Sequence, residues 1–127
     1  DAAKRARLGV DESGAYNSRP LFEENLRRFG VEDVVKPVYM PSVEAAGSTD
    51  TGPVRLLFID SDHSYEGVTA DIANWTPRVV PGGIVVFDDY YSAGFGVKQA
   101  VDELVGAPGF DATLRDAGGL FKWLVKR

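Results

Sequence analysis

The sequence contains no cysteine, so it can form neither a disulfide bond nor a thiolate metal site. This absence fits a cytoplasmic protein, and a cytoplasmic location is our expectation. Basic residues are also sparse, because 14 lysines and arginines stand against 19 acidic residues and leave a net charge of −5. The short KRAR stretch at residues 4–7 is better explained as a solvated helix end. We therefore expect neither nucleic acid nor an anionic membrane surface as a partner.

Long apolar runs are missing as well. No stretch approaches the roughly 20 residues that a transmembrane helix needs, and no signal peptide is visible. The 127 residues are enough for one domain with a modest core, and an apolar fraction of 44% is ordinary for a globular protein. The first residue is not methionine, so we expect the natural N-terminus to lie upstream.

The most informative stretch, residues 54–90, predicts a strand, a helix and a second strand. Two unbroken apolar runs of strand length, residues 56–59 and 84–87, suit strands that are covered on both faces, as in a parallel sheet. Gly82 and Gly83 are expected to turn the chain into the second strand. Between the runs, apolar side chains recur at helical spacing up to a proline that ends the helix: Tyr65, Val68, Ile72, Trp75 and Pro77.

Acidic side chains follow both predicted strands, beside the only histidine, His63. Parallel strands joined by a helix end at the same edge of the sheet, about 4.8 Å apart, so these acids can share one cluster where ligands of open α/β sheets bind. Crowded carboxylates repel, so one of them holds a proton or a cation sits among them. In the alternative interpretation, two of the acids cap helices or stay solvated. The four acids are Asp60, Asp62, Asp88 and Asp89.

The rest of the chain alternates helices and strands, which predicts a three-layer α/β sandwich. The N-terminal part is expected to contain a helix end at 1–7, a strand at 8–10 that ends at Asp11, a helix from the N-cap Ser18 to Gly30, a strand within 31–40, and a short helix opened by Pro41 and Ser42. The C-terminal part is expected to contain a helix that presents Val97, Ala100, Val101 and Leu104, and a hairpin-like pair of strands at 110–114 and 120–125.

Three motifs carry a resemblance to a known family. They are FEENLRRFGVEDVVKPV at 22–38, LLFIDSDHSYEGVTADIANWTPRVVPGGIVVFDDY at 56–90, and GVKQAVDEL at 96–104. Across residues 8–104 the chain resembles the C-terminal half of a class I S-adenosylmethionine-dependent methyltransferase. More narrowly, it resembles the metal-dependent sugar O-methyltransferases of macrolide and aminocoumarin biosynthesis. The resemblance implies a Rossmann-like methyltransferase fold with a mostly parallel sheet and a C-terminal antiparallel strand.

The resemblance also implies roles for the clustered residues. Asp60, Asp88 and Asp89 match positions that bind a divalent cation, and all-oxygen ligands suit Mg²⁺. Asp62 and His63 stand where related enzymes place a general base. Each of these two has a structural alternative, because an acid is favoured at a helix N-terminus and a histidine beside Ser64 can hydrogen-bond the start of the helix.

Further positions match the cofactor site of the family. Asp11 matches the acid that holds the ribose hydroxyls of S-adenosylmethionine, Ser42 falls near the segment that contacts adenine, and Asp60 also belongs to the cofactor-binding set. Two residues depart from the group, since Ser61 stands where glycine is usual and Asp88 where close relatives often have histidine.

The glycine-rich loop that follows the first strand of the family is not found in this sequence. That strand lies in the middle of the sheet in the family, so its loss leaves backbone groups of the neighbouring strands unpaired. We therefore expect residues 1–127 to form one incomplete methyltransferase-like domain. Self-association into a homo-oligomer is a further expectation, because another chain could fill the gap.

The implied function is O-methylation of a small-molecule hydroxyl group, on a sugar or a natural product. Two adjacent hydroxyls would chelate the cation, which lowers the pKa of the reacting hydroxyl, and His63 or Asp62 would remove its proton. One alternative is a catalytically silent, methyltransferase-like binding domain. Another is a phosphotransferase of the haloacid dehalogenase type, because Asp60-Ser-Asp62 resembles its nucleophile motif. Against that alternative, the second acid pair follows too closely, with no lysine in between.

Overall fold

The computed structural model describes residues 17–108, 112–116 and 122–126. The chain divides into two compact units, Asp1–Tyr39 and Met40–Arg127, which are considered separately. Three predictions lie outside the described residues: the helix end at 1–7, the strand at 8–10 and the position of Asp11. None of the helices in the described ranges is long and apolar enough to cross a membrane.

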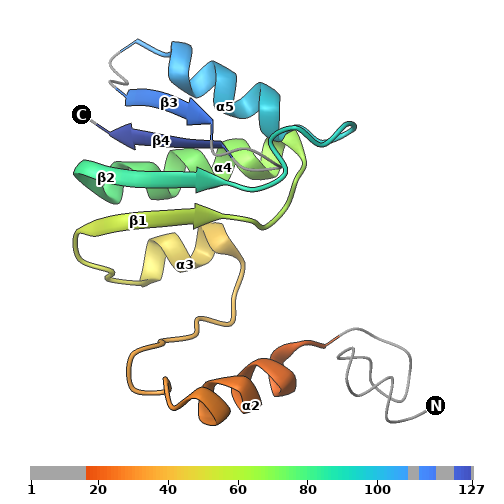
Figure 1. The fold of residues 1–127 in the computed structure, drawn as a ribbon, viewed down its shortest axis with the longest axis vertical. Helices are drawn as coiled ribbons and strands as arrows, with labels where there is room; N and C mark the ends of the chain where they lie inside the picture. The colour runs from red at the N-terminus through yellow and green to blue at the C-terminus, as the bar shows by residue number, and fades with distance from the viewer. Residues whose placement is uncertain (1–16, 109–111, 117–121, 127) are drawn as a thin grey trace. The chain divides into compact units, whose positions relative to one another are not determined.

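In the first unit the predicted helix is confirmed as α2, Arg19–Phe29 (Figure 1). It ends at Gly30, whose left-handed φ of 63° is the conformation that favours glycine after a helix. Ser18 occupies the N-cap position, as predicted, but its side chain makes no capping hydrogen bond. The carboxamide oxygen of Asn17 instead accepts a hydrogen bond from the N–H of Arg19 at 3.1 Å.

The prediction of a strand within residues 31–40 is wrong. The backbone forms turns there, in which the N–H groups of Val34 and Val35 donate to the carbonyl of Val31 at 3.1 and 3.0 Å. A strand needs a neighbour for its backbone groups, and the described part of the chain pairs none with this segment. Pro37 also removes one donor. The apolar side chains therefore stay accessible, and Val34 is 77% exposed.

The second unit holds the predicted strand–helix–strand element at its centre. Its strands form one four-stranded sheet in the order β1-β2-β4-β3. Pro77, the predicted helix-ending residue, lies two residues after the end of α4, within η1. The elements in chain order are α3 (Ser42–Ser48), β1 (Val54–Ile59), α4 (Tyr65–Trp75), the 3-10 helix η1 (Thr76–Arg78), β2 (Val79–Phe87), α5 (Val97–Gly106), β3 (Ala112–Asp116) and β4 (Lys122–Lys126).

The strand directions agree with the predicted α/β fold. β1 and β2 are parallel, with Leu57 opposite Val85, and β4 is antiparallel to both β2 and β3. Strands β1, β2 and β3 therefore run in one direction and β4 runs in the other, as the arrows in Figure 1 show. Among the described strands only β2 pairs with β1, so the outer edge of β1 is open. This open edge agrees with the expectation of a missing first strand.

The glycine pair expected before the second strand lies inside it. β2 begins at Val79, and its register with β1 shifts between Val54 and Leu56. Gly82 adopts a φ of 80°, and a Cβ on Gly83 would come within 2.6 Å of a Val79 methyl group. The two glycines therefore produce an irregularity within β2 instead of a turn before it.

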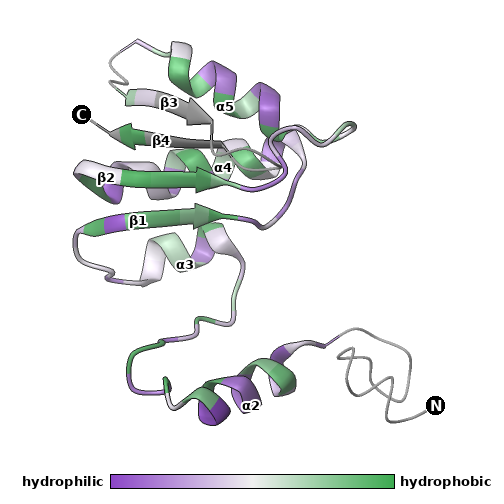
Figure 2. Cartoon of the chain, viewed as in Figure 1, coloured by the Kyte–Doolittle hydropathy of each residue, from purple (hydrophilic) through white to green (hydrophobic). Residues whose placement is uncertain are grey.

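One face of the sheet packs against α4 and α5. The opposite face of β1 carries Leu56 and Phe58, which are 64% and 51% exposed. Figure 2 shows that the residues of β1 and β2 are mostly apolar. The predicted three-layer sandwich has a helical layer on each side of its sheet. The described part of this unit contains the sheet and the helical layer formed by α4 and α5. Its core consists of Ile59, Val68, Ile72, Val79, Val85, Phe87, Tyr90, Val97, Ala100 and Val101.

Candidate functional site

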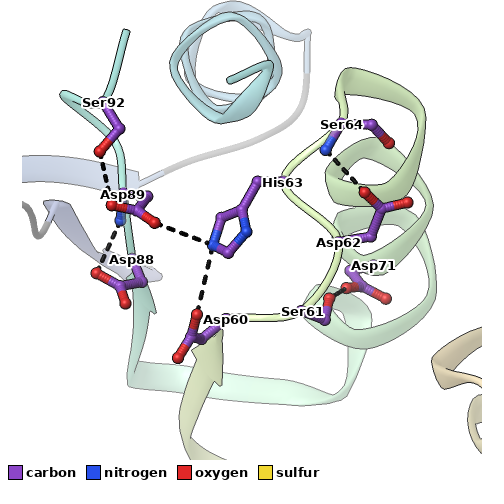
Figure 3. A network of polar contacts seen from close by, with 9 residues as sticks. All are labelled: Asp60, Ser61, Asp62, His63, Ser64, Asp71, Asp88, Asp89 and Ser92. Carbon is purple, nitrogen blue, oxygen red and sulfur yellow. Dashed lines mark hydrogen bonds and ion pairs between the residues drawn. The ribbon is translucent and has the colours of Figure 1, made fainter. Parts of the chain in front are cut away.

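The loop that leaves β1 begins α4 through a capping arrangement built on Asp62. Its carboxylate accepts a hydrogen bond from the N–H of Ser64 at 2.9 Å, and this bond lowers the pKa of Asp62. Ser64 in turn caps α4 by accepting from the N–H of Gly67 at 3.0 Å. A Cβ on Gly67 would lie 2.6 Å from the Asp62 carboxyl carbon, so a larger residue at this position would displace the Asp62 side chain. Asp62 therefore faces the helix start, and its assignment as a general base stays a prediction (Figure 3).

The turn that leaves β2 fixes the other acid pair. The N–H of Asp88 donates to the Ile59 carbonyl at 3.1 Å, which ties the end of β2 to the end of β1. Asp89 has a φ of 53°, an uncommon conformation for a residue other than glycine. Its N–H donates to the Asp88 carboxylate at 2.8 Å, and its own Oδ1 accepts from the Ser92 hydroxyl at 2.6 Å. These bonds leave Oδ2 of Asp89 directed toward the loop after β1 (Figure 3).

His63 connects the ends of the two strands. Its Nε2 atom lies 3.4 Å from Oδ1 of Asp60 and 3.3 Å from Oδ2 of Asp89. That nitrogen is buried and makes no hydrogen bond with the rest of the described chain. The imidazole stacks on Phe95 with 4.8 Å between ring centroids, and the N–H of Gly96 donates to the His63 carbonyl at 2.8 Å. The loop after β2 therefore fixes His63 by two contacts, a ring stack and a backbone hydrogen bond.

The predicted cluster of four aspartates is formed in part. Asp60 and Asp89 converge on His63, whereas the carboxylate of Asp62 is engaged at the start of α4 and that of Asp88 bonds the N–H that follows it (Figure 3). Within residues 17–108, 112–116 and 122–126, no group of three or more histidine or acidic side chains is arranged to hold a metal ion. The oxygen donors are nonetheless the type that Mg²⁺ prefers, and two of them point to one place. The oxygen donors of these aspartates are therefore chemically suited to a hard cation. Of the three predicted ligands, Asp60 and Asp89 are brought together.

A cavity of about 400 Å³ lies beside this cluster, at the carboxyl end of β1. Two residues predicted to bind the cofactor, Ser42 and Asp60, line it. Ser42 is the first residue of α3, and its hydroxyl oxygen accepts a hydrogen bond from the indole N–H of Trp75 at 2.7 Å. Trp75, which the helical spacing assigned to the core, therefore also forms a wall of the cavity. The full lining is Ser42, Leu57, Phe58, Ile59, Asp60, Ser61, Asp71 and Trp75.

Two residues of this region were not predicted from the sequence. Asp71 is only 5% exposed, lines the cavity and accepts a hydrogen bond from the Ser61 hydroxyl. Its signal was present in the sequence, because position 71 shares the helical stripe of Val68 and Ile72 and is the one charged residue on it. Phe95 lies in a loop, and no local pattern indicates its contact with His63.

The comparisons with known proteins agree with this fold. The family described as "Methyltransferase domain" matches residues 2–90, which is more than half of the chain. The chain therefore belongs to this methyltransferase family. The phosphotransferase alternative gains no support from the match.

Individual relatives give the family more detail. The chain is 32% identical over 111 residues to a catechol O-methyltransferase of Mycobacterium tuberculosis, covering 78% of this chain and 49% of that one. It is 28% identical over 96 residues to 8-demethyl-8-(2,3-dimethoxy-alpha-L-rhamnosyl)-tetracenomycin-C 4'-O-methyltransferase of Streptomyces olivaceus, covering 65% and 36%. The chain thus spans less than half the length of either relative.

The structure is also similar to that of cofactor-bound Rv0187 from MTB. The TM-score is 0.72 at 25% sequence identity, and the match covers 86% of this chain and 56% of the other. This similarity confirms the Rossmann-like methyltransferase fold that the motifs predicted.

Proposed function

We propose that this chain forms the part of an S-adenosylmethionine-dependent O-methyltransferase that joins the cofactor site to the reacting hydroxyl group of a small molecule. One observation carries the proposal: the cavity lined by Ser42 and Asp60 adjoins the cluster of Asp60, His63 and Asp89, so that Asp60 belongs to both. Methyl transfer needs the donor and the acceptor oxygen held next to each other. Because Asp60 belongs to both the cavity and the cluster, a cofactor in the cavity would lie next to an acceptor at the cluster.

The cavity is the proposed place of the cofactor. It lies beyond the carboxyl end of β1, where open α/β sheets bind ligands. Its apolar walls, which include Leu57 and Trp75, suit the faces of a nucleoside base, and its polar groups suit the edges of that base. Asp11, the predicted ribose ligand, lies outside the described residues, and its role is part of the proposal.

A divalent cation such as Mg²⁺ is the proposed second cofactor, held by Asp60, Asp88 and Asp89. When bound, such an ion would lower the pKa of a coordinated hydroxyl group and fix its orientation. The support is the convergence of Asp60 and Asp89 and the oxygen chemistry of all three side chains. The carboxylate of Asp88 would exchange its bond to the N–H of Asp89 for the ion.

His63 is the better placed of the two predicted bases. Its Nε2 atom lies between the two converging carboxylates and makes no hydrogen bond among the described residues, so the imidazole is the proposed acceptor of the proton from the acceptor hydroxyl. Asp62 already accepts the N–H of Ser64, which makes it the weaker candidate.

The proposed acceptor is a sugar or natural product with a free hydroxyl group. The support comes from relatives, since the two curated proteins are named as O-methyltransferases, one acting at the 4' position of a rhamnosyl group and one on catechol. A small-molecule acceptor, a cytoplasmic location and self-association through the open edge of β1 are further parts of this proposal. No nucleic acid or membrane partner belongs to it.

A catalytically silent binding domain is the second candidate. The open outer edge of β1 and the glycine-rich loop that the sequence lacks favour it, because both leave part of the family's cofactor site unaccounted for. The two candidates differ in one property: a silent domain transfers no methyl group, whether or not it binds the cofactor.

Titration calorimetry with S-adenosylhomocysteine, with and without Mg²⁺, tests the proposal. We expect saturable binding by the folded chain, weakened in Ser42→Ala and unchanged in Ser48→Ala, a matched change at the other end of α3. A thermal melt of each protein checks that it is folded. A folded chain that takes up no S-adenosylhomocysteine would contradict the proposal, whereas binding without methyl transfer to either catechol or a sugar hydroxyl would favour the silent domain.

A further inference from the structure

Asp71 is a buried carboxylate that the proposed mechanism leaves unused. It lies on the second half of α4, 5% exposed, and is one of two polar or charged residues in the described chain that are buried to this degree. A buried carboxylate is costly unless hydrogen-bond donors surround it, and an ionised one accepts at about four positions. Its hydrogen bond from Ser61 satisfies one of these, and no salt bridge among the described residues reaches it.

The position of Asp71 is as informative as its burial. Its side chain lines the same cavity as Ser42, so the cavity presents an acceptor at one place and a hydroxyl at another. The Ser42 oxygen already accepts the indole N–H of Trp75, which leaves its own proton free to donate. The cavity therefore offers a strong acceptor and a donor between apolar walls.

The edge of an aminopurine carries the donor and acceptor types that match this pair. Adenine carries an exocyclic amino group, which donates, next to a ring nitrogen, which accepts. A purine with a carbonyl in place of the amino group would turn an oxygen toward a carboxylate, and the two would repel each other. Discrimination of this kind is large when a site is built around a buried polar group, because the wrong ligand leaves that group unpaired.

We propose that Asp71, held in place by Ser61, is the specificity residue that recognises the exocyclic amino group of the cofactor's base. This inference rests on the proposed function, since it assigns the cavity to the nucleoside. Ser61 contributes by orienting the carboxylate: its hydroxyl donates to Oδ2 and leaves the other oxygen for the ligand. The serine stands where the resembled group usually has glycine, so this contact is a feature of the present chain.

The test compares two ligands that differ only at the base, S-adenosylhomocysteine and its deaminated analogue S-inosylhomocysteine. Calorimetry on the whole chain should show the adenine form bound about ten- to hundredfold more tightly, the range expected of a hydrogen bond to a charged group. In Asp71→Asn the preference should fall to a few-fold or less, because an amide can also donate to the carbonyl. The ratio of the two ligands on one protein cancels any general loss of folded material.

Glu66→Gln is the matched control, since it removes one negative charge from an exposed position on the same helix. It should leave the preference unchanged. Ser61→Gly should lower the preference less than Asp71→Asn does, because it releases the carboxylate without removing it. An unchanged preference in Asp71→Asn, with S-adenosylhomocysteine still bound, would overturn the inference and leave the proposed function standing. Failure of the folded wild-type chain to bind either ligand would overturn both.

Discussion

Nε2 of His63 lies 3.3 Å from Oδ2 of Asp89, so a side chain from the loop after β1 reaches the acid that follows β2. The contact depends on two turns that are separated by a whole helix and strand. One is held by the cap of α4, and the other by the left-handed backbone of Asp89. The contact between His63 and Asp89 therefore joins the loop after β1 to the loop after β2 within the candidate site.

Replacement of His63 by glutamine should abolish most of the methyl transfer while cofactor binding is retained. Loss of a general base costs about 10²- to 10⁴-fold in kcat. The measurement is transfer of labelled methyl from S-adenosylmethionine to catechol, a probe with two adjacent hydroxyls, with calorimetry of S-adenosylhomocysteine on the same protein. Asp62→Asn is the comparison variant, and a larger loss there than in His63→Gln would transfer the role of base to Asp62.

Replacement of Asp89 by asparagine should weaken Mg²⁺ binding with little effect on folding. Asparagine tolerates the left-handed backbone that Asp89 adopts, so the variant removes charge without adding strain. We expect Mg²⁺ affinity to fall at least about tenfold, which corresponds to about 1.4 kcal/mol. Calorimetric titration of the ion measures it. Asp33→Asn, an exposed change in the first unit, is the control, and equal Mg²⁺ affinity in both variants would remove Asp89 from the set of ligands.

Gly96→Ala should destabilise the second unit. A Cβ at this position would lie 2.2 Å from the backbone nitrogen of Tyr65, and backbone atoms there cannot move away cheaply. We expect a loss of at least about 2 kcal/mol in the free energy of unfolding, measured by urea denaturation. Gly106→Ala is the control, because a Cβ there meets nothing within 4 Å, and it should be neutral or slightly stabilising. Equal stability of the two variants would show that the loop does not pack on α4 as described.

The cap formed by Asp62 should make stability depend on pH in the acidic range. The hydrogen bond from Ser64 lowers the pKa of Asp62 below its ordinary value of 3.8 in the folded chain. The folded state therefore favours the ionised carboxylate, so its contribution is present above that ordinary value and is lost as the pH falls through the lowered one. The stability difference between wild type and Asp62→Ala, measured by urea denaturation, should be constant near neutral pH and shrink below pH 3.8. A difference that grows on acidification has the wrong sign for this cap.

Local patterns explain which parts of the fold could be predicted. β1, α4 and β2 follow from apolar runs and helical spacing within one contiguous stretch, and Pro77 and Gly30 end helices for reasons that need no tertiary context. The strand expected within residues 31–40 was wrong because a strand depends on a neighbour, which no local pattern reveals.

The types of residue at the candidate site could be predicted from the sequence. Their arrangement in space could be predicted only in part. That acids follow both strands is a sequence fact, and the parallel pairing brings Asp60 and Asp89 to one edge. Which acids converge depends on the turns: the backbone of Asp89 and the cap at Asp62 send their carboxylates in different directions. The stacking of Phe95 on His63 depends on the path of a loop, which spacing does not encode.

The ends of β1 and β2 are the proposed place of the cation, and the imidazole of His63 lies next to that place. The sequence has one histidine, so an untagged sample gives one set of imidazole NMR signals. Substoichiometric Mn²⁺, a paramagnetic substitute for Mg²⁺, should broaden those signals selectively in the wild type, and excess Mg²⁺ should restore them. In Asp89→Asn the broadening should need more Mn²⁺. Imidazole signals that stay sharp while Mn²⁺ broadens residues elsewhere would contradict the account.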